Sequence, residues 1–214
     1  MSYILVADDH AIVRYGTLLI LKEAFPEIQV TEAENLSQVL DLMAKKAFDM
    51  LILDINIPGG NNIQMIDAIK LRRPNIKILI FSGYDEKLYA HRYLQRGVHG
   101  YLMKHEREDE IKVAVQTILF MDEIYASPGL KQHMLSDVAG NKTPASNPLM
   151  ALSNRETEVM QLLIKGMGLS EIGASLHLQV STVSTYKTRI FEKLRVSNVV
   201  ELAEIVRIYS SDQE

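Results

Sequence analysis

Cysteine is absent from the 214 residues of this chain. This absence excludes a disulfide framework, a cysteine-ligated zinc or iron–sulfur site, and thiol catalysis. No apolar run approaches the ~18 residues that a membrane span needs, and no basic segment precedes the first aspartates, so we expect no signal peptide and a cytoplasmic protein. A strong net charge is missing as well. The formal charge of −4, taken for the whole chain, argues against a polyanion-binding protein.

Two different patterns divide the chain. In residues 1–121, short apolar runs alternate with stretches of helical spacing, one of which is marked by Ile12, Tyr15 and Leu19. Strands that alternate with helices indicate βαβ units, so we predict an α/β doubly wound parallel sheet of five strands. The predicted strands are Tyr3–Ala7, Ile28–Ala33, Met50–Leu53, Ile76–Phe81 and Gly100–Met103.

Turn-forming residues then gather between positions 126 and 150 and predict a linker. From Leu152 onward the pattern is helical throughout. The sequence Ser153-Asn154-Arg155-Glu156 is typical of a capping box at the start of a helix. We predict three further helices, and therefore a small all-α domain of four helices with a tight turn at His177–Gln179. The expected domains are residues 1–122 and 150–214, joined by residues 123–149. The three further helices are about Leu169–Leu176, Val180–Leu194 and Val199–Ile208.

Polar side chains stand at the carboxyl ends of the predicted strands, namely Asp8, Asp9, Asp54, Ser82 and Lys104. In a doubly wound sheet these ends meet at one edge. Clustered carboxylates repel one another unless a cation lies among them, and an oxygen-only set with room for phosphate suits Mg²⁺. The lysine can pair with a phosphate oxygen. Each residue alone has a simpler interpretation as a helix cap, a turn residue or a solvated charge, but their joint placement favours a single site.

These motifs give residues 1–121 a resemblance to a two-component receiver domain, and nearly the whole chain resembles a response regulator of the NarL/FixJ type. The resemblance implies the strand order 2-1-3-4-5. It also implies that Asp54 accepts a phosphoryl group from a sensor histidine kinase or a histidine phosphotransfer domain. The motifs that carry it are Asp8-Asp9, Asp54 with Pro58, Ser82-Gly83 and the run Gly100-Tyr101-Leu102-Met103-Lys104.

The resemblance further implies a role for each side chain in this site. Two departures from the family pattern leave the chemical groups intact: Asn61-Asn62 replaces an acidic residue and glycine, and His105 stands where aspartate is usual. The implied Mg²⁺ residues are Asp9, Asp54, the backbone carbonyl of Asn56 and, through water, Asp8. The implied phosphoryl-site residues are Lys104, Ser82 and Tyr101, the last of which would swing inward.

The helix predicted at Val180–Leu194 carries short hydroxyl side chains on one face and cations beside them. Short polar side chains can read base edges while cations hold phosphates, although a solvated amphipathic helix would look similar. The runs Leu152–Glu156 and Thr182–Arg189 resemble the LuxR-type output domain. This resemblance implies base contacts by Ser184, Thr185 and Thr188, and phosphate contacts by Thr182, Lys187, Arg189 and Lys193. It also implies a homodimer on promoter DNA through Val199, Leu202, Ala203 and Val206.

Three functions fit these motifs. The first is a transcription factor that phosphorylation controls and that is not an enzyme. A Mg²⁺-dependent phosphatase with an aspartyl nucleophile is disfavoured, because Asn56 stands where such enzymes need a second acid. A DNA-binding protein with a phosphorylation-independent receiver is disfavoured by the intact acidic pair, Ser82 and Lys104. The acidic net charge does not exclude DNA binding, because residues 180–195 carry four cations against Glu192 alone. With so few cations, we expect a strong dependence on dimerisation.

Overall fold

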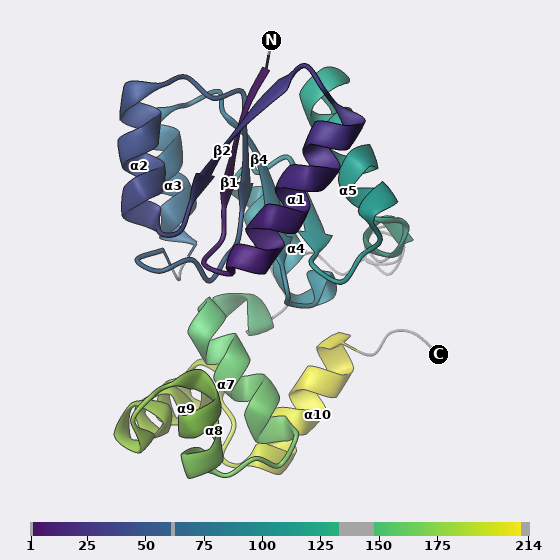
Figure 1. The fold of residues 1–214 in the computed structure, drawn as a ribbon. Coiled ribbons are helices and arrows are strands. Elements are labelled where there is room, and N and C mark those ends of the chain that lie inside the picture. The colour runs from purple at the N-terminus through teal and green to yellow at the C-terminus, as the bar shows by residue number, and fades with distance from the viewer. Residues whose placement is uncertain (1, 61–62, 133–147, 211–214) are drawn as a thin grey trace. The chain divides into compact units, whose positions relative to one another are not determined.

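The computed structural model describes residues 2–60, 63–132 and 148–210. The chain divides into two compact units, Met1–Leu135 and Ser136–Glu214 (Figure 1). The two family departures at Asn61 and Asn62, and most of the expected linker, lie outside the described residues. No helix in the described ranges is long and apolar enough to cross a membrane.

The first unit is a five-stranded parallel sheet in the order β2-β1-β3-β4-β5, which confirms the predicted doubly wound fold. The fourth strand begins and ends one residue later than predicted, and Ser82 is therefore its last residue. The strands are β1 Ser2–Ala7, β2 Ile28–Ala33, β3 Met50–Leu53, β4 Lys77–Ser82 and β5 Gly100–Met103. The helices are α1 Ala11–Ala24, α2 Leu36–Lys45, α3 Gln64–Arg72, α4 Glu86–Gln95 and α5 Glu108–Val115, followed by a π-helical turn η1 Gln116–Phe120.

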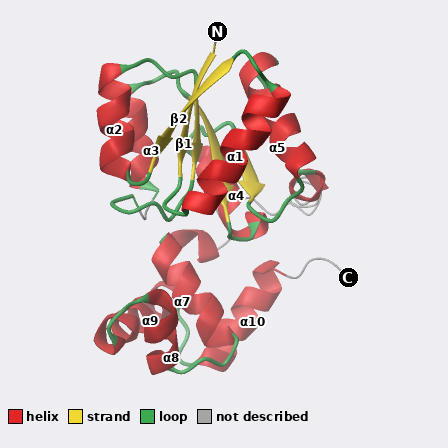
Figure 2. Ribbon diagram, in the orientation of Figure 1, coloured by secondary structure: helices red, strands yellow, loops and turns green. Residues whose placement is uncertain are grey.

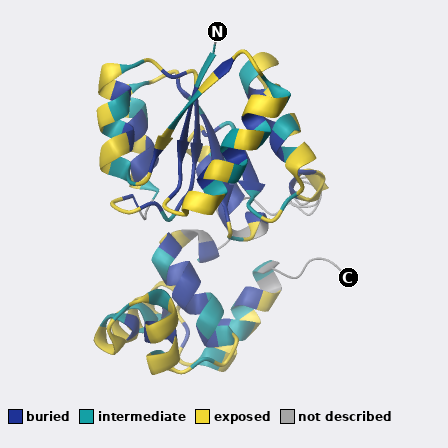
Figure 3. Ribbon diagram, viewed as in Figure 1, coloured by how far each residue is buried: buried dark blue, intermediate teal, exposed yellow. Residues whose placement is uncertain are grey.

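Alternate side chains of the strands enter two separate cores, one on each face of the sheet. Figure 3 shows the central strands in the colour of buried residues. On β1, Leu5 joins the core beneath α2, α3 and α4, whereas Ile4 and Val6 join the core beneath α1 and α5. Strands that are buried on both faces read as continuous apolar runs, which is why the sequence pattern located them well. Packing on both faces holds the strands in place, and with them the carboxyl ends at which Asp8, Asp54 and Lys104 lie.

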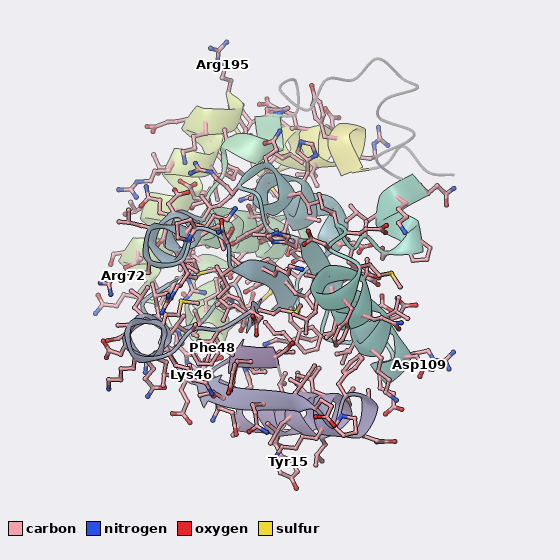
Figure 4. The ribbon with its side chains drawn as sticks, turned by 90° about the horizontal axis from the view of Figure 1, so that it is seen from above. Tyr15, Lys46, Phe48, Arg72, Asp109 and Arg195 are labelled. Atoms are coloured by element: carbon pink, nitrogen blue, oxygen red, sulfur yellow. The ribbon has the colours of Figure 1, made fainter. Side chains whose placement is uncertain are left out.

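Helix α1 forms where its spacing predicted, but the residues that marked it lie on the outside. Ile12, Tyr15 and Leu19 are 88%, 61% and 49% exposed, and Figure 4 shows Tyr15 pointing away from the unit. The inner face instead buries Arg14 and Leu21. The apolar stripe thus predicted the helix correctly without indicating which face packs on the sheet.

Residues 123–132, which the sequence assigned to the linker, pack into the first unit. Tyr125 forms a parallel bridge with Gly100 of β5, and its hydroxyl donates to Glu110 at 2.6 Å. Ser127, which is buried, donates to Glu86 of α4 at 2.6 Å, and Leu130 is 2% exposed. The segment therefore extends the first unit beyond η1.

At the opposite end of the sheet, a lysine covers aromatic rings. The Lys46 ammonium lies 3.7 Å from the ring centroid of Tyr3 and 5.6 Å from that of Phe48, and Figure 4 shows Lys46 beside Phe48. Such cation–π contacts contribute about 0.5–1 kcal/mol at exposed positions. These contacts lie at the amino ends of the strands, away from the clustered carboxylates.

In the second unit, all regular secondary structure within residues 148–210 is helical (Figure 2), as predicted. The capping box is confirmed: Ser153 accepts from the Glu156 backbone N–H, and Glu156 accepts from that of Ser153 at 2.7 Å. The predicted turn ends α8 with His177 in the left-handed region at φ 54°. A short turn η3 Pro148–Ala151 precedes the four helices α7 Asn154–Ile164, α8 Leu169–Leu176, α9 Val180–Leu194 and α10 Val199–Ser210.

Candidate functional site

The parallel sheet brings the predicted strand-end residues together. The Asp54 N–H donates to the Ala7 carbonyl at 2.8 Å, and the Lys104 N–H donates to the Ser82 carbonyl at 2.7 Å. These bonds continue the strand pairing past the ends of β3 and β5, which fixes the backbone from which the two side chains extend. The sequence pattern predicted this convergence, and the structure shows it.

Lys104 links the two buried carboxylates of the cluster. Its Nζ lies 2.6 Å from Asp8 Oδ2 and 3.0 Å from Asp54 Oδ2. Asp8 and Asp54 are 2% and 3% exposed, whereas Asp9 remains exposed. Although it is ion-paired, Asp8 Oδ2 has no partner with hydrogen-bond geometry among the described residues. One ammonium therefore neutralises two carboxylates only in part.

The pKa of the Asp54 carboxyl is raised above its usual value. Burial is the largest cause, because it penalises the charged form, and the nearby Asp8 carboxylate adds to the increase. Lys104 opposes both effects through its charge and a hydrogen bond. A further cation bound at the cluster would lower this pKa, because it would favour the charged carboxylate.

Two residues that the sequence reasoning missed hold the acidic pair in place. His10 Nδ1 lies 3.1 Å from Asp8 Oδ1 and 2.7 Å from Asp9 Oδ1. Arg14, only 6% exposed, donates to the Asp8 carbonyl at 2.7 Å and pairs with Glu34 at 2.5 Å. A charged residue on the inner face of a predicted helix is the signal that could have identified Arg14, since buried charges are normally paired.

The atoms that could hold a metal ion lie within 4.8 Å of one another, one each from Asp8, Asp9, His10 and Asp54. Three are carboxylate oxygens, and two of those carboxylates, Asp8 and Asp54, are buried. Mg²⁺ prefers such oxygen ligands. The donor set therefore fits the ion that the sequence predicted, and His10 is the nitrogen donor that the sequence did not indicate.

Polar groups from four loops line the space above Asp54. A pocket there is lined by His10, Asn56, Tyr84 and Lys104, among others. The Asn56 amide donates to the Tyr84 hydroxyl, and the fully buried Ser82 accepts from the Tyr84 N–H at 3.2 Å. Tyr84 is a site residue that the sequence did not reveal.

Tyr101 already points inward in this structure. It is 0% exposed, and its hydroxyl donates to the Tyr84 carbonyl at 3.0 Å. Burial raises the pKa of its phenol well above the usual value. The inward position that the family resemblance assigned to a phosphorylated state is thus available to this chain without a phosphoryl group.

In the second unit, the predicted base-reading face of α9 is exposed. Ser184, Thr185 and Thr188 lie on it, and Arg189 is exposed beside them. A shallow pocket on the helix is lined by Ser181, Thr182, Thr185, Tyr186 and Arg189. Val183 and Ile190 on the opposite face are completely buried. The packing therefore leaves the hydroxyl-bearing face to solvent.

The cations of α9 differ in their surroundings. Lys187 lies over the ring of Phe191 at 5.3 Å, and Arg195 ends the helix in the left-handed region at φ 55°, projecting outward in Figure 4. Lys193, predicted as a phosphate contact, pairs with Glu156 at 2.7 Å and donates to the Ala151 carbonyl. Lys193 thus contacts the capping box of α7 within its own unit.

The residues predicted for a dimer contact on α10 divide between its two faces. Leu202 and Val206 are 0% and 8% exposed, and α10 packs against α7. Val199 and Ala203 are half-buried, whereas Val200 is 71% exposed. Two of the four residues to which the resemblance assigned a dimer contact therefore pack inside their own unit, and Val200 is an exposed apolar residue on the outward side of α10.

Comparison with known proteins agrees with both units. Residues 4–116 match the family "Response regulator receiver domain", and residues 150–206 match "Bacterial regulatory proteins, luxR family". The chain is 30% identical to the virulence factors transcription regulator BvgA of Bordetella pertussis, covering 95% of this chain and 96% of BvgA. It is 32% identical to the oxygen regulatory protein NreC of Staphylococcus carnosus, covering 94% of each.

Solved structures show the same fold. RcsB of Salmonella enterica serovar Typhimurium, solved on promoter rprA with the phosphomimetic BeF3⁻, has a TM-score of 0.63 and 23% identity, covering 95% of this chain and 97% of RcsB. The family match covers more than half of the chain, and the curated relatives match almost all of it. The chain belongs to the response regulators that join a receiver domain to a LuxR-type DNA-binding domain.

Proposed function

We propose that Asp54 is the phosphoacceptor of this regulator, with a sensor histidine kinase or a histidine phosphotransfer domain as the donor. The observation that supports this most is the buried pair of carboxylates, Asp8 and Asp54, joined by the Lys104 ammonium. An ion pair that only stabilises the fold needs one carboxylate and one cation, whereas here a single ammonium contacts two buried carboxylates. Phosphoryl transfer needs such positive charge around the attacking carboxylate.

Asp8, Asp9, Asp54 and the backbone carbonyl of Asn56 would hold Mg²⁺. The grouping of carboxylate oxygens from Asp8, Asp9 and Asp54 within 4.8 Å supports this assignment. When bound, the ion supplies charge neutralisation for the phosphoryl oxygens. Lys104, 3.0 Å from Asp54 Oδ2, would supply a second positive charge.

In the transfer, an Asp54 carboxylate oxygen bonds to phosphorus while the phosphorus–nitrogen bond of the donor phosphohistidine breaks. Lys104 then pairs with a phosphoryl oxygen instead of a carboxylate oxygen, and the Ser82 hydroxyl donates to another. Asn56 cannot act as a general acid or base, so we expect slow self-dephosphorylation and no turnover of free phosphate esters.

Phosphorylation promotes dimerisation and promoter binding in this proposal. The exposed hydroxyl face of α9 supports base contacts by Ser184, Thr185 and Thr188, with Thr182, Lys187 and Arg189 at phosphates. The curated relatives BvgA and NreC are named as regulators. A dimer contact through α10 and a cytoplasmic location, where promoter DNA is accessible, complete the proposal, together with a DNA-binding domain that begins near residue 150.

Intact mass after incubation with a small phosphodonor and Mg²⁺ tests the acceptor. We expect one phosphoryl group on the wild-type chain and none on Asp54→Asn. Asp67→Asn is the matched control, because Asp67 is an exposed aspartate that pairs with Arg96 on the surface. Equal labelling of the wild type and Asp54→Asn would show that Asp54 is not the acceptor.

A further inference from the structure

Two threonines on the exposed face of α9 have already used their only hydrogen-bond donor. The Thr185 hydroxyl donates to the Ser181 carbonyl at 2.9 Å, and the Thr188 hydroxyl donates to the Ser184 carbonyl at 3.1 Å. Both threonines are exposed and lie three positions apart, so they share one face of the helix. This face is the one that would enter the major groove.

A hydroxyl group has one donor hydrogen and two acceptor lone pairs. When the hydrogen bonds to a carbonyl four residues earlier, the oxygen can still accept, and the threonine methyl remains free for apolar contact. Thr185 and Thr188 therefore offer DNA an acceptor and a methyl group. The neighbouring Ser184 has no hydroxyl hydrogen bond among the described residues and keeps its donor.

The four base pairs differ in what they offer such a side chain. An A·T pair presents the adenine N6 amino donor and the thymine methyl in the major groove. A G·C pair presents the cytosine amino donor but no methyl, and its guanine edge carries two acceptors that need a donor. Only the A·T pair matches both of the free features of each threonine.

The geometry points to Thr185 and Thr188 as readers of A·T base pairs, through acceptance from adenine N6 and methyl contact with thymine. Bidentate arginine or asparagine readers do not occur at positions 181, 184, 185 or 188, all of which are serine or threonine. The inference rests on the proposed function, because it assumes that α9 enters the major groove.

Selection from a random duplex library by the phosphorylated full-length chain gives the bound motif. Repeating the selection with Thr185→Ala and Thr188→Ala identifies the base pair whose preference each threonine sets. We expect A·T at both positions in the wild-type motif and a loss of preference at one position in each variant. A wild-type preference for G·C at those positions would overturn the inference.

Base analogues then separate the two contacts. Replacing thymine by uracil at either position removes the methyl and should weaken wild-type binding by about fourfold. Replacing adenine by purine removes the N6 amino group and should weaken it by roughly three- to tenfold. Unchanged affinity with both analogues would also overturn the inference.

Isosteric variants give a matched comparison. Thr185→Val keeps the methyl but has no acceptor, so it should respond to uracil and not to purine. Thr185→Ser keeps the hydroxyl without the methyl, so it should respond to purine and not to uracil. If both variants respond as the wild type does, the threonine does not make these contacts.

The selection also distinguishes this inference from the proposed function. If the phosphorylated chain recovers no DNA sequence, the proposed function fails and the inference fails with it. If it recovers a motif that changes neither in Thr185→Ala nor in Thr188→Ala, DNA binding stands and only the assignment of these two readers is wrong.

Discussion

Lys104 is the residue on which the electrostatics of the acidic site depend. Its ammonium lies within 3.0 Å of carboxylate oxygens from two strand ends, Asp8 and Asp54. Removal of this charge would leave two buried carboxylates facing one another, and burial already raises the pKa of Asp54. The same lysine therefore stabilises the resting site and, in the proposed function, would pair with a phosphoryl oxygen after transfer.

His99 makes the stability of the first unit depend on pH. Its Nδ1 accepts from the Ile78 N–H at 3.1 Å. Burial, followed by the charges of Lys70 and Lys77, lowers the pKa of its imidazole from 6.5. The unfolded state then binds more protons than the folded state, so stability should decrease as pH falls below about 6.5. Urea unfolding at pH 7.5 and pH 5.5 measures this decrease.

The pH effect should be smaller in His99→Gln, in which the side chain cannot titrate. His105→Gln is the control, because His105 is exposed and its replacement should leave the decrease in place. A decrease of the same size in His99→Gln and in the wild type would attribute the pH dependence to other groups.

Lys193 and Arg189 lie on the same helix but should differ in what their loss affects. Burial raises the pKa of Glu156, but hydrogen bonds from Lys193 and Ser153 outweigh it and lower the pKa overall. Lys193→Met therefore leaves a buried carboxylate without its cation and should cost about 1 kcal/mol of unfolding free energy. Thermal unfolding and DNA titration of Lys193→Met and of Arg189→Met check this.

For Arg189→Met we expect weaker DNA binding and unchanged thermal stability, since its side chain is exposed. The reverse pattern is expected for Lys193→Met. If Lys193→Met instead weakens DNA binding without a thermal effect, the original prediction of a phosphate contact is correct.

The sequence predicted the residues of the acidic site because strand ends follow directly from the apolar runs. Asp54 and Lys104 could be placed without any knowledge of side-chain contacts. Arg14 and Tyr84 could not, because their roles depend on which face of α1 packs inward and on how the loop after β4 folds over Asp54. The local sequence pattern determines where a site residue lies along the chain, whereas tertiary packing determines which side chain it contacts.

At the scale of the element, the turn between α8 and α9 depends on Gly173. A Cβ at this position would lie 2.8 Å from the backbone carbonyl of Leu178. That carbonyl is fixed in the turn, because the Leu178 N–H donates to the Gly173 carbonyl at 2.8 Å. Gly173→Ala should therefore destabilise the second unit by about 1–3 kcal/mol, despite the better helix propensity of alanine.

Thermal unfolding of Gly173→Ala measures the cost of this close approach. Gly16→Ala is the matched control, because Gly16 is also helical and a Cβ there would meet nothing within 4 Å. We expect Gly16→Ala to be neutral or up to about 1 kcal/mol stabilising. Equal stabilisation by both substitutions would mean that the turn adapts freely.

Helices α1 and α10 show that an apolar residue on a helix does not by itself indicate which face of the helix packs inward. On α1 the apolar residues used to predict the helix are exposed. On α10 two of the four residues predicted for a dimer contact, Leu202 and Val206, pack inward. Both faces of each helix carry apolar side chains. The sequence therefore predicts the helix from its periodicity, but it does not show which face packs inward.

For the whole molecule, we expect DNA binding to depend on both phosphorylation and salt. Few cations lie on α9, and one of them pairs with Glu156. Affinity should fall by about 0.9 log unit per log unit of salt for each phosphate neutralised. Titrations of the phosphorylated and unphosphorylated chain across a salt series measure the slope, and a salt-independent affinity would contradict contact through α9.

A dimer would make twice as many phosphate contacts as a monomer, so the salt slopes of the phosphorylated and unphosphorylated chain can be compared. The phosphorylated chain should show about twice the slope of the unphosphorylated chain if phosphorylation brings a second α9 onto the same duplex. Equal slopes, with equal sedimentation coefficients of the two forms, would separate DNA binding from dimerisation.

The bridge between Tyr125 and Gly100 has a consequence for how far the two domains can separate. Because residues 123–132 pack with the first unit, only residues 133–147 remain between the described parts. Whatever their conformation, they can span at most about 50 Å, about half the reach of the linker expected from sequence. A shorter tether raises the effective concentration of one domain around the other. In the proposed function, each copy of α9 would search DNA from the volume that this tether allows around its own receiver.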